Sequence, residues 1–287
     1  MIRSSLCVVT FCLIFFGITE QTSSQEQLAQ TQSVKQLSVA TLVGYPPFII
    51  AKRNLRAAHY EVVPPGLDSD SIMGYSWDVF RGSFHQQGYT INLKVYPWVR
   101  AIEEVKKQKV DLLFPAGWTK DRSEYLLYSK RSINKVDFLI YVNQTSSIQW
   151  NGLQGLKKLR IGLMRGWSYG EQWADLNNVK KIPVNDILQG FRMLDNNRID
   201  GFAGYFPVFD YTLNKVNKST QYRKLPAFDS TYEFVVSAIN NPRANELITA
   251  FDKGMKALAK SGVLEKAKRT WLYDMPVESS RNKQESQ

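Results

Sequence analysis

Arg122 lies just past a buried apolar run, in a position that suits the binding of an anion. Arg122 follows Thr119 by three residues, and a short loop of small residues separates both from the apolar run 110–114. A guanidinium pairs bidentately with a carboxylate because its donors form a planar fork. Ligands of α/β sheets bind at the carboxyl ends of strands, so Arg122 is predicted to clamp a carboxylate. The alternatives are a surface ion pair for Arg122 and a helix cap for Thr119.

A strand–helix–strand unit is predicted to hold these residues in place. The run 93–96 is predicted to be a strand, 98–107 an amphipathic helix and 110–114 a second, buried strand. A similar unit recurs loosely at 182–200, where Ile199-Asp200 corresponds to Val110-Asp111. Strands alternate with helices throughout, which predicts an α/β fold of two similar lobes with mostly parallel sheets.

Two further segments carry predictions of their own. The stretch 166–170 has a glycine at each end and is predicted to open a helix, whose free backbone N–H groups would form an anion site at Trp167 and Ser168. The polar, proline-containing stretch 51–70 is predicted to be a loop at the rim of the site. The aspartates at 78, 111 and 200 are expected to be structural.

The first 24 residues have the pattern of a secretory signal peptide. Arg3 precedes an apolar run, 6–18, that is too short for a transmembrane helix of about 20 residues. Both cysteines lie in this segment, so the mature chain has none, which excludes disulfides and thiolate catalysis. The segment 25–36 is polar and rich in glutamine, and is expected to be a disordered lead-in.

The formal charge of +11 does not indicate a nucleic-acid-binding protein. Lysines and arginines alternate with acids, as expected for solvated helix faces, and export makes a nucleic-acid partner less plausible still. A basic surface of this kind favours anionic ligands or partners. His59 and His85 have no second ligand at metal spacing, so neither a metal nor another cofactor is predicted.

Several motifs, in order and spacing, resemble family 3 of the bacterial extracellular solute-binding proteins. The resemblance covers about residues 37–275. Its motifs are Tyr45-Pro46-Pro47-Phe48, Gly74-Tyr75-Ser76-Trp77-Asp78, Thr119-Lys120-Asp121-Arg122, Arg160-Ile161-Gly162, Arg198-Ile199-Asp200-Gly201 and Gly262-Val263-Leu264-Glu265-Lys266.

The resemblance implies a two-lobed, hinge-bending fold of the type II periplasmic binding proteins. Lobe one would comprise 37–137 plus 235–275, lobe two 138–234, and 276–287 would be a flexible tail. The crossing strands near 138–142 and 233–236 would form the hinge. A ligand that contacts both lobes shifts the population toward the closed state.

The resemblance also implies which residues contact the ligand. Arg122 would bind the ligand carboxylate, with Trp167 and Ser168 supporting it from lobe two. Tyr45 and Trp98 would wall the site, although packing in the core is the alternative for both. The remaining candidates are Gly117, Trp118 and Thr119 in the loop before Arg122, and Tyr205 in lobe two.

The sequence departs from the family pattern at Tyr205, where the family usually has an aspartate that pairs with the ligand's ammonium group. Glu171 and Asp210 are nearby acids, but neither has the expected spacing. A buried ammonium group without a partner is costly. The expected ligand is therefore a small carboxylate-bearing solute that is not a standard amino acid.

The leading prediction is a periplasmic, monomeric binding protein that serves an ABC permease or a membrane sensor and is not an enzyme. The alternative is an enzyme on the same fold, similar to the dehydratases that act on cyclohexadienyl acids. That alternative requires a carboxylate with a tuned pKa near the cleft.

Overall fold

The computed structural model describes residues 35–53, 55 and 59–273. The described residues belong to one compact unit. The predicted signal peptide, most of the predicted lead-in and the predicted tail 276–287 lie outside the described residues. Within the described part of the chain, no helix is long and apolar enough to cross a membrane.

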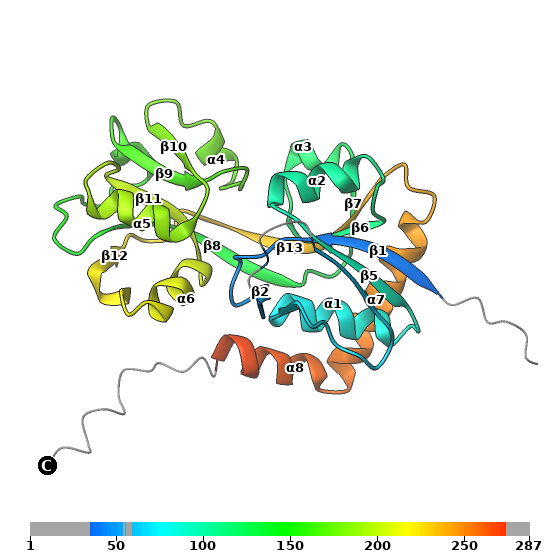
Figure 1. Cartoon of the computed structure of the whole chain (residues 1–287). Coiled ribbons are helices and arrows are strands. Elements are labelled where there is room, and N and C mark those ends of the chain that lie inside the picture. Colours follow the sequence, from blue (N-terminus) through cyan, green and yellow to red (C-terminus); the bar gives the residue numbers. More distant parts are fainter. Residues whose placement is uncertain (1–34, 54, 56–58, 274–287) are drawn as a thin grey trace, which may run out of the picture. The chain divides into compact units, whose positions relative to one another are not determined.

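One long sheet runs through this unit (Figure 1). In sheet order its strands are β10 (Lys180–Val184), β9 (Arg160–Met164), β11 (Gly201–Phe206), β8 (Asn134–Asn143), β13 (Asp229–Ala238), β6 (Leu112–Gly117), β1 (Gln36–Thr41), β5 (Thr90–Val95) and β3 (His59–Val63). The short strands β12 (Tyr222–Lys224) and β7 (Leu126–Tyr128) pair with β8 and β13, and β2 (Ile50–Ala51) pairs with β4 (Ile72–Met73).

The helices cover the sheet in two groups. The first half of the sheet, β6–β1–β5, carries α1 (Tyr75–His85), α2 (Trp98–Lys106), α3 (Lys120–Ser123), α7 (Ala244–Lys260) and α8 (Val263–Lys268). The second half, β10–β9–β11, carries α4 (Glu171–Ala174), α5 (Ile187–Asp195) and α6 (Val208–Lys215). Single turns at Leu153–Leu156, Ser219–Gln221 and Arg269–Tyr273 complete the helical elements.

Each half contains the parallel arrangement that alternating strands and helices predict. In the first half β1 pairs in parallel with both β5 and β6. In the second half β9 pairs in parallel with both β10 and β11. The antiparallel pairs of this long sheet involve the crossing strands β8 and β13 and the edge strand β3. The carboxyl ends of both parallel sets therefore lead toward the loops that carry the candidate site residues.

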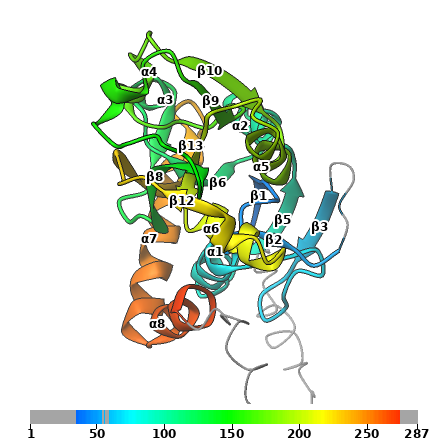
Figure 2. The same ribbon diagram turned by 90° about the vertical axis from the view of Figure 1, so that its left-hand side faces the viewer.

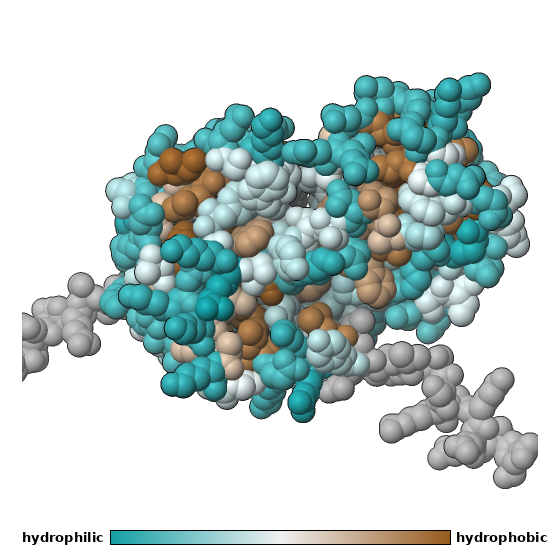
Figure 3. Space-filling view, turned by 180° about the vertical axis from the view of Figure 1, so that it is seen from behind, coloured by the Kyte–Doolittle hydropathy of each residue, from teal (hydrophilic) through white to brown (hydrophobic). Residues whose placement is uncertain are grey.

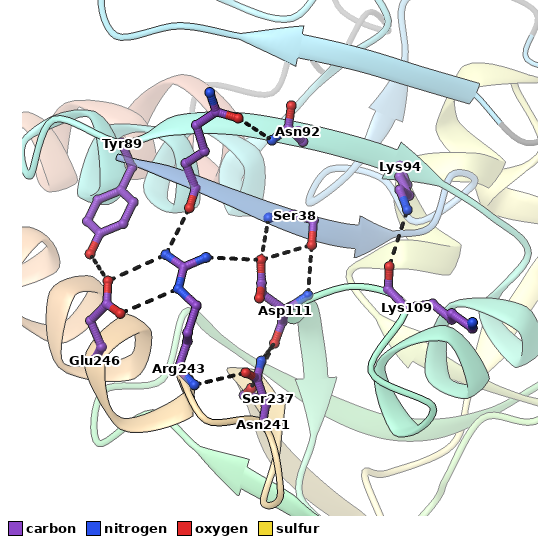
Figure 4. A network of polar contacts seen from close by, with 11 residues as sticks. Ser38, Tyr89, Asn92, Lys94, Lys109, Asp111, Ser237, Asn241, Arg243 and Glu246 are labelled. Atoms are coloured by element: carbon purple, nitrogen blue, oxygen red, sulfur yellow. Dashed lines mark hydrogen bonds and ion pairs between the residues drawn. The ribbon is translucent and has the colours of Figure 1, made fainter. Parts of the chain in front are cut away.

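Asp111 fastens two neighbouring strands of the first half to α7 (Figure 4). Its carboxylate accepts hydrogen bonds from the backbone N–H and the hydroxyl of Ser38, at 2.8 and 2.9 Å. Arg243, just before α7, lies 3.6 Å from the same carboxylate. Asp200 occupies the equivalent place in the second half, where it accepts from the backbone N–H of Arg160 at 2.7 Å. Both aspartates therefore have the structural role that the sequence predicts.

Replacing Asp111 by alanine is expected to reduce the free energy of unfolding by roughly 1–3 kcal/mol, because the Ser38 N–H and hydroxyl lose a charged acceptor. Urea denaturation at neutral pH measures the change. Glu124→Ala is the control, since Glu124 is an exposed acid without such bonds in the described structure, and it is expected to stay within about 0.5 kcal/mol. An Asp111 variant as stable as the wild type would contradict the assignment.

The stretch 51–70 is not a loop throughout, which corrects the prediction. Residues 59–63 form β3, which pairs in antiparallel register with β5 at the outer edge of the sheet (Figure 2). Three of its five residues, Tyr60, Val62 and Val63, are β-formers. The short length of the strand and the prolines that follow it hid this pattern, and the pairing itself comes from contact with β5.

The face seen from behind Figure 1 is mainly hydrophilic, and its hydrophobic residues form separate patches (Figure 3). Exposed apolar residues in small groups are normal on folded proteins. This face shows no large continuous apolar patch.

Candidate ligand-binding site

A small cavity lies where the two halves of the sheet meet, and it encloses about 290 Å³ of empty space, part of it open to solvent. Its walls come from both halves and from the crossing strand β13. The lining residues are Leu42, Tyr45, Trp98, Pro115, Gly117, Arg122, Trp167, Ser168, Tyr205 and Glu233.

Arg122 is placed by the short helix α3, which begins directly after β6. The Thr119 hydroxyl accepts a hydrogen bond from the Arg122 backbone N–H at 3.1 Å and so caps this helix. The guanidinium donates to the Gly117 carbonyl at 3.0 Å and lies 5.3 Å from the ring centre of Trp98. Among the described residues, no carboxylate lies within 4.0 Å of Arg122, so the ion pair with a neighbouring acid is not present. The guanidinium therefore retains donors for a ligand.

Aromatic rings enclose the cavity from both halves. Trp167 packs against Tyr45 edge to face, with ring centres 5.2 Å apart, and against Tyr205 at 4.6 Å. Tyr205 in turn stacks on Phe138 of β8 at 4.8 Å. Such walls exclude water and strengthen the electrostatic interactions inside the cavity.

A hydrogen bond outside the sheet also links the two halves, at Trp98 of the cavity wall. The Trp98 indole N–H, from the start of α2, donates to the Gly166 carbonyl at 3.0 Å. Gly166 packs closely against the start of α2, because a Cβ at this position would lie 3.0 Å from a methyl group of Val99 and 3.5 Å from the Trp98 ring. The halves therefore contact each other through a close packing of backbone and indole.

Glu233 is a buried carboxyl group in the cavity wall that the sequence analysis did not single out. Its side chain is only 4% exposed. Its two oxygens accept hydrogen bonds from the Tyr45 hydroxyl at 2.6 Å and from the Asn134 amide at 2.5 Å. Burial raises the pKa of Glu233 from 4.5 to about 7, although these two bonds and the charge of Arg122 lower it in part.

A hydrogen bond from Ser76 fixes the orientation of the Asn134 side chain. The Ser76 hydroxyl, in α1, donates to the carbonyl oxygen of the Asn134 amide at 2.9 Å. The amide nitrogen then faces Glu233. Ser76 is fully buried, so the chain Ser76–Asn134–Glu233 is an internal support for the cavity wall.

Seven of the nine candidate residues line this one cavity, in agreement with the sequence analysis: Tyr45, Trp98, Gly117, Arg122, Trp167, Ser168 and Tyr205. The other two do not line it. Thr119 serves as the cap of α3, and Trp118 is 49% exposed. Ligand contact by any of the nine stays a prediction.

The segment 166–170 is a glycine-bounded turn before a helix, as predicted, with Gly170 as the N-cap of α4. The backbone N–H groups of Trp167 and Ser168 precede the helix, which corrects the predicted position of the anion site. Gly166 and Gly170 both have positive φ angles, of 76° and 86°, so the chain between them turns instead of coiling. The helix α4 begins only at Glu171 and has four residues. Trp167 and Ser168 therefore meet the cavity from a loop.

The two acids considered as substitutes for the missing aspartate lie elsewhere. Asp210 accepts from the Tyr141 hydroxyl at 2.8 Å and pairs with Lys224, and neither Asp210 nor Glu171 lines the cavity. The described residues contain no cluster of histidine, cysteine, aspartate or glutamate that could hold a metal ion. The lining residues that the sequence analysis missed are Leu42, Pro115 and Glu233.

The fold, with two crossing strands between two α/β halves, is that of the type II periplasmic binding proteins. A family model described as bacterial extracellular solute-binding proteins, family 3, matches residues 37–274. The chain belongs to this family, which confirms the resemblance found in its motifs. Proteins of the family are extracellular or periplasmic.

Individual relatives agree with this assignment. The arginine-binding extracellular protein ArtP of Bacillus subtilis is 25% identical over 281 residues, which cover 93% of this chain and 96% of that protein. The crystal structure of the substrate-binding protein of an amino acid ABC transporter gives a TM-score of 0.67 at 20% identity, covering 83% of this chain and 99% of the other. A histidine kinase sensor domain with similarity to periplasmic binding proteins gives 0.69 at 18% identity, covering 83% and 96%.

Proposed function

We propose that this chain is an exported receptor that binds a small solute through the solute's carboxylate, with Arg122 as the clamp. The observation that carries the proposal is the position of Arg122. Its guanidinium lines an aromatic cavity and has no carboxylate within 4.0 Å among the described residues. A cation held in this way between aromatic rings is preorganised to bind the anionic group of a ligand.

The two lobes are proposed to be 37–137 plus 235–275 and 138–234, with β8 and β13 as the hinge. In support, these two strands are the ones that pair with each other between the two parallel sets. The cavity has walls from both sets. A ligand that touches both is expected to favour the closed state because it gains contacts only there.

The proposed partner is an ABC permease, with a membrane sensor as the alternative. The relatives support both, since one is the binding protein of an amino acid ABC transporter and another is a sensor domain. Periplasmic location after cleavage near Ser24 is part of the proposal, as is a monomeric state. The signal-like pattern of residues 1–24 supports export.

A thermal-shift screen of the 25–287 protein against amino acids, other small organic acids, polyamines and aromatic metabolites tests the proposal. A ligand of the folded state raises the melting temperature by mass action. Calorimetry then gives the affinity of each hit. We expect Arg122→Ala to weaken carboxylate hits roughly 10- to 100-fold, which is the loss of a charged hydrogen-bond pair.

Lys120→Ala is the matched control, because Lys120 is an exposed cation of the same short helix and does not line the cavity. It removes the same charge and is expected to leave the affinity unchanged. Hits that bind Arg122→Ala as tightly as the wild type would refute the carboxylate clamp. A complete lack of hits would count against a receptor for small solutes of these classes.

One observation supports a second candidate, an enzyme similar to the cyclohexadienyl dehydratases. Glu233 is a buried carboxyl group in the cavity, and its pKa is raised to about 7, which suits a general acid. Incubation of the protein with cyclohexadienyl acids, followed by chromatography of the products, tests this candidate. Turnover that Glu233→Gln abolishes would support it, whereas binding without turnover would exclude it for those substrates.

A further inference from the structure

The lining of the cavity includes one cationic side chain and one carboxyl group. The carboxyl group does not lie at position 205, where the family pattern places an acid. Arg122 and Glu233 are the ionisable acid–base pair of its lining. The position at which the family pattern places an acid holds Tyr205. Its hydroxyl donates to the Ser168 carbonyl and is thereby engaged within the second half. Glu233 instead belongs to β13, the strand that crosses between the halves.

Glu233 accepts hydrogen bonds from two neighbours and can accept more. Tyr45, after β1, and Asn134, on β8, each donate one hydrogen bond, one to each oxygen. A carboxylate can accept about four hydrogen bonds, so each oxygen keeps a free lone pair. The side chain lines the cavity, and these remaining acceptor sites are available to a donor that enters it.

The two charged groups are close enough to affect each other. Glu233 is the register partner of Gly117 on β6, and Gly117 is the residue whose carbonyl accepts from the Arg122 guanidinium. The charge of Arg122 lowers the pKa of Glu233 in part, and both side chains line the same small cavity. A ligand whose anionic and cationic groups are close together can therefore contact both.

We propose that Glu233 binds the ammonium group of a zwitterionic ligand whose carboxylate is bound by Arg122, and that it thereby determines the specificity of the cavity. This inference rests on the proposed function of Arg122. An α-amino acid carries both groups on one carbon, so it can present them to two side chains of the same small cavity. Glu233, on the hinge strand β13, then takes the role of the aspartate that the family usually has at the position of Tyr205. A standard amino acid would therefore have a partner for its ammonium group in this cavity.

Protonation makes this role measurable. With its pKa raised to about 7, Glu233 is mostly protonated at pH 6 in the free protein. An ammonium group that binds beside it favours the carboxylate form and expels the proton. Binding of a zwitterion at pH 6 should therefore release about one proton, whereas a ligand without the ammonium group should release none.

The test uses glycine and those L-amino acids that have a 2-hydroxy acid counterpart, in which a neutral hydroxyl group replaces the ammonium group. Calorimetry of the 25–287 protein at pH 6 in buffers of different ionisation enthalpy gives both the affinity and the number of protons released. We expect at least one amino acid to bind more tightly than its hydroxy acid and to release about one proton. In Glu233→Gln, the affinity for that amino acid should fall roughly 10- to 100-fold and the proton release should vanish.

The control variant is Asp137→Asn, which makes the same charge change on the neighbouring crossing strand but outside the cavity. This variant should still bind the amino acid more tightly than its 2-hydroxy acid and should still release about one proton. If every amino acid binds only as tightly as its 2-hydroxy acid, the inference is overturned and the carboxylate clamp remains. The same holds if Glu233→Gln still binds the amino acid more tightly than the hydroxy acid. Failure of both partners of every pair to bind would overturn it as well, and hits among other carboxylates would then show whether the proposed function stands.

Discussion

Glu233→Gln is expected to raise the free energy of unfolding by about 2–3 kcal/mol at pH 8 and to change it little at pH 4. The reason is the cost of keeping a charged carboxylate in a buried wall. Burial raises its pKa from 4.5 to about 7. In the unfolded chain the same group is hydrated and has its ordinary pKa. The wild type therefore carries a penalty that glutamine removes.

The pH window follows from the direction of this shift. Between about pH 4.5 and pH 7 the folded protein retains a proton that the unfolded chain has released, so stability falls as the pH rises. Above pH 7 the penalty is complete, and at pH 4 both states are protonated. The groups facing Glu233 from other elements are Arg122, Tyr45 and Tyr205. Burial raises the pKa of both tyrosines, so they stay neutral throughout this range.

Glutamine can keep the local hydrogen bonds. Its carbonyl oxygen can accept from the Tyr45 hydroxyl, and its amide can donate to Asn134 if that amide turns over. The Ser76 hydroxyl permits this turn because it can accept as well as donate. Some of the gain is lost in this rearrangement, which is why the expected value lies below the full effect of the pKa shift.

Urea denaturation of both proteins at pH 4 and pH 8 measures the prediction, with Asp137→Asn as the control for a simple change in net charge. A gain of equal size at both pH values, or a loss of stability at pH 8, would contradict it. A more stable variant that binds its ligand more weakly would mean that Glu233 is retained for function at the expense of stability.

The sequence was sufficient to predict seven of the cavity residues because they lie in loops next to recognisable motifs. Arg122 follows a strand and a cap residue at fixed spacing, and Tyr45 precedes two prolines. The carboxyl ends of parallel strands gather such loops at one edge of a sheet. Trp118 and Thr119 share the same loop, but the turn into α3 directs Thr119 to a capping role and leaves Trp118 exposed.

Glu233 could not be predicted with the same reasoning, because it lies inside a strand and not in a loop. The segment 233–236 was identified as a crossing strand, but the direction of its side chains depends on the register with β6, which shifts between Phe234 and Val236. A usable signal was nevertheless present. Glu233 is the single charged residue in the stretch 230–238, and a lone carboxylate in an apolar strand is a candidate for a functional group.

The errors in secondary structure arose where tertiary contacts decide the outcome. The strand β3 exists because β5 offers a free edge to five residues of an insertion. The turn 166–170 keeps Trp167 and Ser168 outside the helix because both of its glycines have positive φ angles, and α4 begins only after Gly170, its N-cap. Propensity is a weak guide for segments this short.

A further feature hidden from the sequence is the close approach of α1 and α7. Gly254, in the middle of α7, lies directly against the backbone of α1. A Cβ at this position would lie 2.0 Å from the carbonyl oxygen of Ser83. Backbone atoms cannot move aside as a flexible side chain can. Glycine at this point thus allows α7 to pack closely against α1. The helix α1 carries Ser76, which hydrogen-bonds to Asn134, the donor to Glu233.

Gly254→Ala is therefore expected to reduce the free energy of unfolding by about 3 kcal/mol, at the upper end of overpacking costs, because α7 must move away from α1. Helix propensity alone would favour alanine by about 1 kcal/mol, so the sign of the measured change decides between the two effects. Urea denaturation at neutral pH provides the measurement. Gly82→Ala on α1 is the matched control: its Cβ would meet the end of the Leu258 side chain at 3.0 Å, which can shift, so the change is expected to stay within about 1 kcal/mol. A Gly254→Ala protein as stable as the wild type would mean that the two helices can separate without loss, and would contradict the prediction.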